Sequence, residues 1–184
     1  MYHNYTDENF EQLFGLVTDA TKQLLEFDID LFSMINQATQ DIQERKLHEV
    51  CINHRLAVYL ERSAPKFGLH GYFVDIEYNR NMANPKEARR NASDPTRIVR
   101  PDILIHRRTD IQTDIPHYLV IEAKKENTSH DDIDKIGRLL QDNRFRYKFG
   151  LTVSYLSDPD SIKGMVYYYE QGREKTKELK VAKH

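Results

Sequence analysis

The chain has 184 residues, of which 39% are hydrophobic and 30% charged, and its mean hydropathy is −0.72. This composition is typical of a folded globular protein and argues against a disordered chain. It also argues against a membrane protein, because no apolar run approaches the ~18 residues that a spanning helix needs. The net charge of −2 disfavours nucleic-acid binding unless the charge is unevenly distributed along the chain.

The start of the chain and its cysteine content indicate a cellular compartment. Residues 1–10 are polar and acidic, whereas a secretory signal has a basic start and an apolar stretch. The single cysteine, Cys51, cannot form a disulfide within the chain and has no neighbours at zinc-ligand spacing. We therefore expect a cytoplasmic protein in which Cys51 fills part of the core.

Charge is strongly asymmetric along the chain. Residues 1–49 contain ten acidic and three basic residues, a net charge of −7, which leaves +5 for the remainder. A polyanion would be repelled by the first segment and attracted by the rest. The expected organisation is an acidic helical extension over residues 1–43, a single core domain over residues 44–170 and a basic tail over residues 171–184.

Three helices are predicted in the first third of the chain. The first is predicted over about residues 7–26, where apolar residues recur at helical spacing: Phe10, Leu13, Phe14, Val17 and Leu24. A second, short helix is expected from Leu31 to about Gln43, with Asp30 as its cap. The third, over residues 44–62, has apolar residues on more than one side and is expected to be largely buried.

The middle of the chain alternates strands with a polar segment. Residues 72–78 are rich in aromatic and β-branched residues and predict a strand. Residues 79–100 are polar and rich in arginine and asparagine, which predicts a mobile loop. Residues 103–105 and 118–121 are apolar at consecutive positions, so these two strands are expected to be covered on both faces.

The last third completes an α/β pattern. A helix is predicted over residues 131–142, and strands over residues 149–156 and 164–170. The tail from residue 171 is basic and poor in apolar residues, so it is expected to fray. The expected fold is a mixed sheet flanked by helices, with the element order αβββαβ and one appended strand.

The two apolar strands bring charged residues together. They are expected to pair as an antiparallel hairpin centred near Gln112, which places Asp102 opposite Ala123. Glu122 and Lys124 point to one side and flank that position. Two carboxylates about 5 Å apart repel by roughly 3 kcal/mol at an effective dielectric near 20, so the pair favours a cation. Oxygen ligands suit Mg²⁺ or Mn²⁺.

The run Arg100-Pro101-Asp102 with three following apolar residues, and the later run Val-Ile-Glu122-Ala-Lys124, resemble the signature of the PD-(D/E)XK nuclease superfamily. The predicted αβββαβ order resembles the core of the same superfamily. Shorter runs around Glu49, over residues 54–57 and over residues 74–80, resemble uncharacterised bacterial and phage-type members. The resemblance implies a restriction-endonuclease-like fold.

The resemblance also implies an activity and a metal site. The expected protein is a Mg²⁺- or Mn²⁺-dependent endonuclease that hydrolyses phosphodiester bonds of DNA with a metal-activated water. Asp102, Glu122 and the backbone carbonyl of Ala123 would bind the metal. Lys124 would orient the attacking water or help to deprotonate it.

Glu49 is a further candidate for catalysis and metal binding, since it matches the helical acid of the superfamily. It shares a helix face with Ile52 and Leu56, so packing of that face against the sheet would direct Glu49 towards the metal site. A surface ion pair with Lys46 or Arg55 explains this glutamate equally well.

Other charged residues have both functional and structural interpretations. Lys135 would contact phosphate, although an ion pair with Asp131 or Asp132 is slightly favoured. Asp75 and Glu77 would add metal ligands, orient the neighbouring loop or form structural ion pairs, and His106 is expected either to pack or to support a site residue. The residues expected to bind nucleic acid in a salt-dependent manner are Arg89, Arg90, Arg97, Arg100, Arg107, Arg108 and Lys135.

Two other classes of protein remain open. A non-catalytic nucleic-acid-binding or regulatory module on a decayed nuclease fold would show salt-sensitive binding without metal-dependent cleavage. An interaction protein would use acidic residues 1–43 to mask the basic region or to bind a basic partner. The three tyrosines at 167–169 could stack on bases, but a sheet edge or a homodimer contact is the simpler reading.

Overall fold

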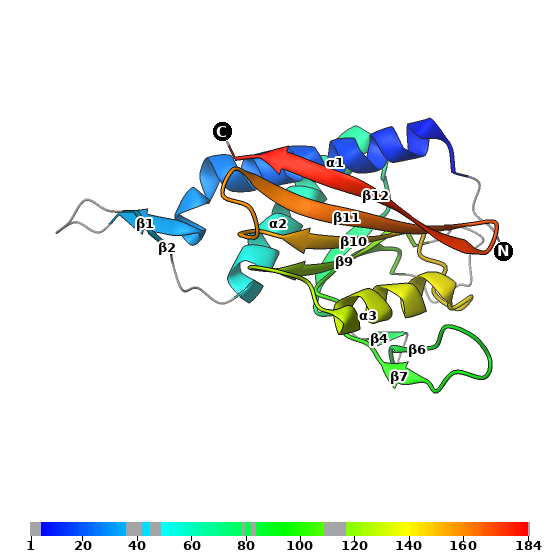
Figure 1. Cartoon of the computed structure of the whole chain (residues 1–184). Coiled ribbons are helices and arrows are strands. Elements are labelled where there is room, and N and C mark those ends of the chain that lie inside the picture. The colour runs from blue at the N-terminus through cyan, green and yellow to red at the C-terminus, as the bar shows by residue number, and fades with distance from the viewer. Residues whose placement is uncertain are drawn as a thin grey trace.

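The computed structural model of the chain describes residues 5–35, 42–44, 49–78, 80–81, 84–108 and 117–183. A six-stranded sheet forms the centre, with α1 and α2 on one face and α3 on the other (Figure 1). The helices are α1 (Asp7–Phe27), α2 (Glu49–Ser63) and α3 (His130–Gln141). In spatial order the strands are β12 (Arg173–Ala182), β11 (Ser161–Glu170), β10 (Phe149–Ser154), β9 (Leu119–Lys124), β8 (Ile103–His106) and β3 (Phe73–Ile76).

The sheet is mixed but mostly antiparallel. Only β9 and β10 run parallel, and α3 connects them. The order α2, β3, β8, β9, α3, β10 follows the predicted sequence of helix, three strands, helix and strand. The remaining short elements are η1 (Ile29–Leu31), β1 (Ser33–Ile35), β2 (Ile42–Glu44), η2 (Ala64–Phe67), β4 (Arg80–Asn81), β5 (Asn84–Pro85), β6 (Glu87–Ala88) and β7 (Arg97–Ile98).

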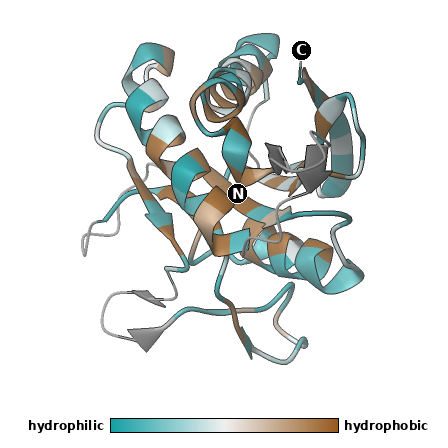
Figure 2. Ribbon diagram, turned by 90° about the vertical axis from the view of Figure 1, so that its left-hand side faces the viewer, coloured by the Kyte–Doolittle hydropathy of each residue, from teal (hydrophilic) through white to brown (hydrophobic). Residues whose placement is uncertain are grey.

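Alternation along β8 and β9 divides the core into two layers. Ile103 and Ile121 pack with α1 and α2, whereas Leu104 and Val120 pack with α3. All four side chains are fully buried, which explains why these strands read as continuous apolar runs. Figure 2 shows that the hydrophobic residues of the helices gather towards the sheet.

Capping residues fix where two helices begin. The Thr6 hydroxyl accepts a hydrogen bond from the Asn9 backbone N–H at the start of α1, and the Asn9 side-chain oxygen accepts one from the Thr6 backbone N–H. Ser129 and Asp132 form the same reciprocal pair at α3. Each pair satisfies backbone N–H groups that the first helical turn leaves free. The predicted helices over residues 7–26 and 131–142 are confirmed to within one residue.

The predicted helix from Leu31 to about Gln43 is wrong in the part of it that the structure describes. Residues 33–35 and 42–44 form the antiparallel strands β1 and β2 instead. Phe32, just before β1, is buried with its ring centre 5.7 Å from that of Tyr155. A helix of this length is marginal in water without a packed face, and β1 and β2 project from the body of the protein (Figure 1).

Residues 86–99 of the polar segment pack on the α3 side of the sheet rather than forming the predicted mobile loop. Ala88 and Val99 are buried in the core layer on the α3 side of the sheet. Lys86 is only 2% exposed, and its ammonium donates a hydrogen bond to the Tyr147 hydroxyl at 3.1 Å. The mainly polar composition obscured the few residues that attach the segment.

The prediction that the tail frays is also wrong, because β12 pairs with β11 over its whole length. Gln171 and Gly172 join the two strands, and both have positive φ, as a two-residue hairpin turn requires. Leu179 and Val181 bury the inner face of β12. With β12 outside it, β11 is an interior strand, which corrects the sheet-edge interpretation of its tyrosines.

Two further findings concern exposure and the membrane. Cys51 is exposed on α2, so the prediction that it fills the core is wrong. Tyr167 and Tyr168 are both buried. Within the described part of the chain, no helix combines the length and the apolarity that crossing a membrane requires.

Gly150 sets the distance between α3 and the sheet. A Cβ atom at this position would lie 2.2 Å from Cγ2 of Ile136 on α3, far inside van der Waals contact. Gly150→Ala is therefore expected to lower the free energy of unfolding by about 1–3 kcal/mol through overpacking. Urea denaturation measures this loss, and an unchanged midpoint would show that α3 is not held at this distance.

Candidate active site

The register of the β8–β9 hairpin differs from the predicted one by a single residue. Ile103 pairs with Ile121, so the next step along the ladder places Asp102 opposite Glu122 rather than opposite Ala123. Both faces of these strands are apolar, so the sequence pattern contains no polarity that would fix the register. Residues opposite one another point to the same face, and the observed register therefore puts both carboxylates on the α3 side of the sheet.

Asp102 is anchored by the neighbouring strand. Its Oδ2 accepts a hydrogen bond from the backbone N–H of Ala123 at 2.9 Å. The N–H and C=O of one strand residue point to the same edge, so the Ala123 carbonyl faces the Asp102 side of β9. The carbonyl of the next residue, Lys124, instead accepts from Tyr155 beside β10, as this alternation requires.

Glu122 is fully buried, and its two oxygens differ in environment. Oε2 accepts a hydrogen bond from the Lys135 ammonium at 2.5 Å, whereas Oε1 has no hydrogen-bond partner within the described residues. Burial foremost, and then the charge of Asp102, raises the pKa of Glu122 to about 8, while Lys135 acts in the opposite direction. Without an additional cation the group is therefore mostly protonated at neutral pH.

Lys124 lies between two acids. Its Nζ is 3.7 Å from Oδ2 of Asp102 and 3.7 Å from Oε2 of Glu49. Burial lowers the pKa of this ammonium, but the surrounding carboxylates, Asp102 foremost, outweigh burial and hold the pKa above its usual value. Lys124 is accordingly a cation in this arrangement.

Glu49 reaches the site from the first turn of α2. Ile52 and Leu56 on the same face are buried against the sheet, as the sequence predicted. Oε2 of Glu49 is buried, and within the described residues it has no hydrogen-bond partner. Of the two alternative partners suggested for this glutamate, Arg55 instead binds Asp28 at 2.8 Å, and Lys46 lies outside the described residues.

A buried hydrogen bond joins α2 to the end of β10, close to Glu49. The Tyr155 hydroxyl donates to Oδ1 of Asn53 at 2.9 Å, and both side chains are buried. Neither residue carried a functional signal in the sequence, because Tyr155 ends an apolar strand and Asn53 sits within an apolar helix face. Their contact ties the N-terminal half of α2 to the end of β10.

Tyr155→Phe is expected to destabilise the fold by about 1–3 kcal/mol, since it leaves the Asn53 amide buried without its partner. The measurement is the midpoint of urea unfolding, with Tyr169→Phe as the comparison, because the Tyr169 hydroxyl donates an exposed hydrogen bond to Glu174. Equal midpoints for Tyr155→Phe and the wild type would contradict the positioning role.

Lys135 forms the expected ion pair with Asp132, but its closest partner is a different acid. Glu122, on the neighbouring strand, is its closest acid, and Asp132 lies at 3.8 Å. Asp132 accepts hydrogen bonds from the backbone and side chain of Ser129, which offset its burial and lower its pKa. The position of Lys135 one turn into the helix that follows the motif was the only sequence signal for this contact.

The donor set suits a hard divalent cation. The candidate ligands are oxygens, and the partnerless atoms Oε1 of Glu122 and Oε2 of Glu49 are both buried. Across the described ranges, no three acidic, histidine or cysteine side chains already converge as a ready metal cluster. Mg²⁺ commonly binds through one or two carboxylates together with waters and substrate phosphates, so the residues present fit such an ion.

The arginines expected to bind nucleic acid divide into separate groups. Arg90 and Arg97 lie 3.0 and 4.0 Å from the carboxylate of Asp134 on α3. Arg100 lies 3.9 Å from Glu77, at the same end of the sheet as Asp102. The Arg89 side chain is exposed. Several of these positive charges are therefore partly compensated within the chain.

Arg107 and Arg108 lie beyond the other end of β8. At about 3.3 Å per residue, Arg108 is roughly 20 Å along the strand from Asp102. Its guanidinium pairs with Asp75, which also contacts His106 at 2.7 Å. Asp75 therefore has the structural ion pair foreseen for it, and His106 is buried in the packing role expected of it.

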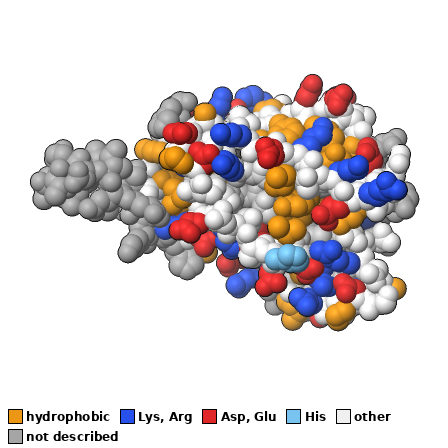
Figure 3. All heavy atoms as spheres, viewed as in Figure 1, with side chains coloured by type: hydrophobic (Ala, Val, Ile, Leu, Met, Phe, Trp, Pro, Cys, Tyr) orange, Lys and Arg blue, Asp and Glu red, His pale blue; other side chains and the backbone are white. Residues whose placement is uncertain are grey.

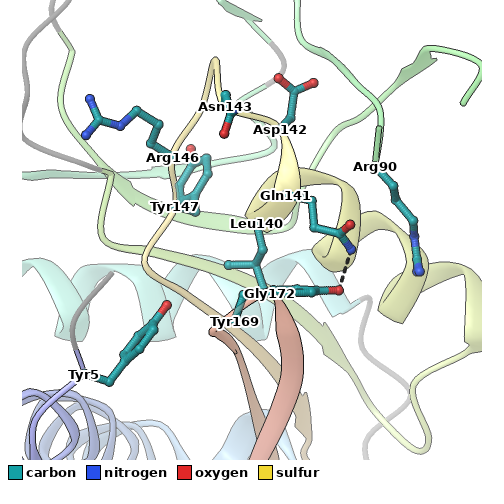
Figure 4. A pocket seen from close by; sticks show the side chains of 10 residues that line it. All are labelled: Tyr5, Arg90, Leu140, Gln141, Asp142, Asn143, Arg146, Tyr147, Tyr169 and Gly172. Atoms are coloured by element: carbon teal, nitrogen blue, oxygen red, sulfur yellow. Dashed lines mark hydrogen bonds between the residues drawn. The ribbon is translucent and has the colours of Figure 1, made fainter. Parts of the chain in front are cut away.

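A cavity of about 310 Å³ lies at the opposite end of α3 from the carboxylates. Figure 4 shows Leu140 between Tyr5 and Tyr169, with Gln141 donating a hydrogen bond to Tyr169. The cavity contains none of the acids of the β8–β9 hairpin. The chemistry suggested by the sequence motif is therefore placed outside this cavity.

Comparison with protein-family models, with curated proteins and with solved structures finds no match to this chain. Function is therefore inferred from the motif and from the geometry around Asp102 and Glu122.

Proposed function

We propose that this protein is a metal-dependent nuclease of the PD-(D/E)XK type that hydrolyses phosphodiester bonds of DNA. One observation carries the proposal: Asp102 and Glu122 share one face at the end of a buried hairpin, with Lys124 beside them. Glu49 adds a third carboxylate from a separate helix. Such a concentration of acids is costly to desolvate and favours a bound cation.

The topology supports a restriction-endonuclease-like core. The order α2, β3, β8, β9, α3, β10 agrees with the αβββαβ order of the superfamily that the sequence resembles. The motif residues lie where β8 begins and β9 ends, so both carboxylates lie at the same end of these two antiparallel strands. On this reading α1 and the β11–β12 hairpin are additions to the core.

Asp102, Glu122 and the Ala123 carbonyl would hold Mg²⁺ or Mn²⁺, with Glu49 nearby. The ion would supply positive charge to the phosphoryl oxygens and would lower the pKa of water at the site. Lys124, as an ammonium, would stabilise negative charge on the attacked phosphate and orient the water by donating a hydrogen bond. Lys135 holds Glu122 in position from α3.

The test is incubation of the purified protein with plasmid, linear and branched DNA, with Mg²⁺, with Mn²⁺ or with EDTA. The proposal expects cleavage with a divalent ion and none in EDTA. DNA binding without cleavage under all of these conditions would instead favour the non-catalytic module on a decayed nuclease fold.

A further inference from the structure

The sheet register aligns a row of polar residues beside the proposed catalytic carboxylates. Lys124 pairs with Ser154 on β10, Ser154 with Lys163 on β11, and Lys163 with Lys180 on β12. Paired residues point to the same face, so the row lies on the α3 side, as Glu122 does. With strands about 4.8 Å apart, it extends roughly 14 Å from Lys124 to Lys180.

A groove of about 490 Å³ follows this row. One wall is the segment before α3, at Asn127 and Thr128, and the floor comes from β10, β11 and β12. The groove is lined by residues that include Thr152 and Ser154, whose strand partners are Glu122 and Lys124. It therefore opens next to the proposed centre, unlike the cavity in Figure 4.

The lysines of the groove can change partners. Lys163 and Lys180 are 50% and 65% exposed, and they share one carboxylate, that of Asp158, at 2.8 and 3.8 Å. Lys183 donates a hydrogen bond to the backbone oxygen of the same residue. Glu178, an acid that lines the groove, belongs to the adjacent row that contains Glu122. Two exposed ammonium groups thus share a single carboxylate and suit a phosphate in its place.

The face drawn in Figure 3 has a mixed distribution of charge. Figure 3 shows acidic and basic side chains interspersed over the visible face, without one continuous basic patch. A polyanion on this face would therefore be recognised by a local set of hydrogen-bond donors rather than by a broad basic patch. The row of Lys124, Ser154, Lys163 and Lys180 supplies such a set.

We infer that this groove holds the phosphodiester backbone of the nucleic-acid strand that is cut, with Lys163 and Lys180 binding phosphates next to the scissile one. The inference rests on the proposed nuclease function and assigns a substrate track to a hairpin outside the αβββαβ core. Asp158 then acts as the intramolecular competitor that the phosphates displace.

The experiment measures binding to a fluorescently labelled oligonucleotide in EDTA, so that cleavage plays no part. Lys163→Gln/Lys180→Gln is expected to weaken binding about tenfold or more at low salt. The slope of log affinity against log salt should fall by about 1.4 on a single strand or 1.8 on a duplex, for two lost phosphate contacts. Asp158→Asn should act in the opposite direction and tighten binding.

The matched control is Arg173→Gln/Lys175→Gln, which removes the same charge from the opposite face of the same hairpin. It should leave the slope within about 0.3 of the wild-type value. Thermal melting establishes that the variants are folded. Equal slopes for the two double variants, a wild type that does not bind, or weaker binding by Asp158→Asn would each overturn the inference. Failure of the nuclease proposal would appear separately, as intact DNA in the Mg²⁺ assay.

Discussion

Asp102→Asn is expected to reduce Mg²⁺-dependent DNA cleavage by at least about a thousandfold, because a catalytic metal contributes several kcal/mol of transition-state stabilisation. The substitution preserves the shape of the side chain and its ability to accept the Ala123 N–H. It removes the negative charge that would hold the ion next to Glu122. The fold should therefore survive while the activity is lost.

The measurement is the initial rate of plasmid cleavage at saturating Mg²⁺, with circular dichroism to verify folding. Asp131→Asn is the control, since Asp131 is an exposed acid in the first turn of α3. The control should keep the wild-type rate within about twofold, as expected for a surface change. Similar rates for Asp102→Asn and the control would remove Asp102 from the catalytic centre.

Glu122→Gln is expected to stabilise the metal-free protein at alkaline pH. The pKa of Glu122 rises from an ordinary 4.5 to about 8, chiefly through burial. A carboxyl with a raised folded-state pKa stabilises the fold below pH 4.5, and this contribution is lost as the pH rises through 8. Gln carries no charge at any pH, so the variant avoids a penalty of on the order of a few kcal/mol at pH 9.

Thermal melts of both proteins in EDTA at pH 5 and pH 9 test this expectation. At pH 9 the variant should melt higher by roughly 2–4 °C for each kcal/mol, and at pH 5 the two curves should nearly coincide. Adding Mg²⁺ should stabilise the wild type more than the variant, because the ion favours the ionised carboxylate. A wild type as stable as Glu122→Gln at pH 9 in EDTA would contradict the burial of this charge.

The parts of the fold that the sequence predicts best are those with strong periodicity or continuous apolar runs. The apolar runs at residues 103–105 and 118–121 became β8 and β9, with both faces covered as predicted. The same doubly apolar pattern explains the error of one residue in register, since it leaves no polar face to align. The sequence therefore predicted which side chains lie around Asp102, but not which residue lies directly opposite it on β9.

The sequence of the last strand has the periodicity of a β-strand, but its high content of charged residues outweighed that signal. Leu179 and Val181 alternate with charged residues, which is strand periodicity, and Gln171-Gly172 suits a two-residue turn. The density of charge over residues 173–180 nevertheless favoured a fraying tail. An edge strand with one exposed face carries such charges without loss of pairing.

Other features depended on contacts between distant segments. The Tyr155–Asn53 hydrogen bond joins residues 102 positions apart, and the Lys135–Glu122 pair depends on how α3 packs over β9. No local pattern encodes either contact. The basic residues near the motif were visible in the sequence, but their acidic partners on α3 and β3 were not.

The most direct test of a divalent-cation site between Asp102 and Glu122 is a crystal structure of the wild-type protein soaked in Mn²⁺, with anomalous scattering recorded for the metal. The expected result is a peak within about 2.0–2.4 Å of carboxylate oxygens from both residues, with the Ala123 carbonyl facing the ion. A map at saturating Mn²⁺ without such a peak, in which Lys135 still holds Glu122, would contradict the account.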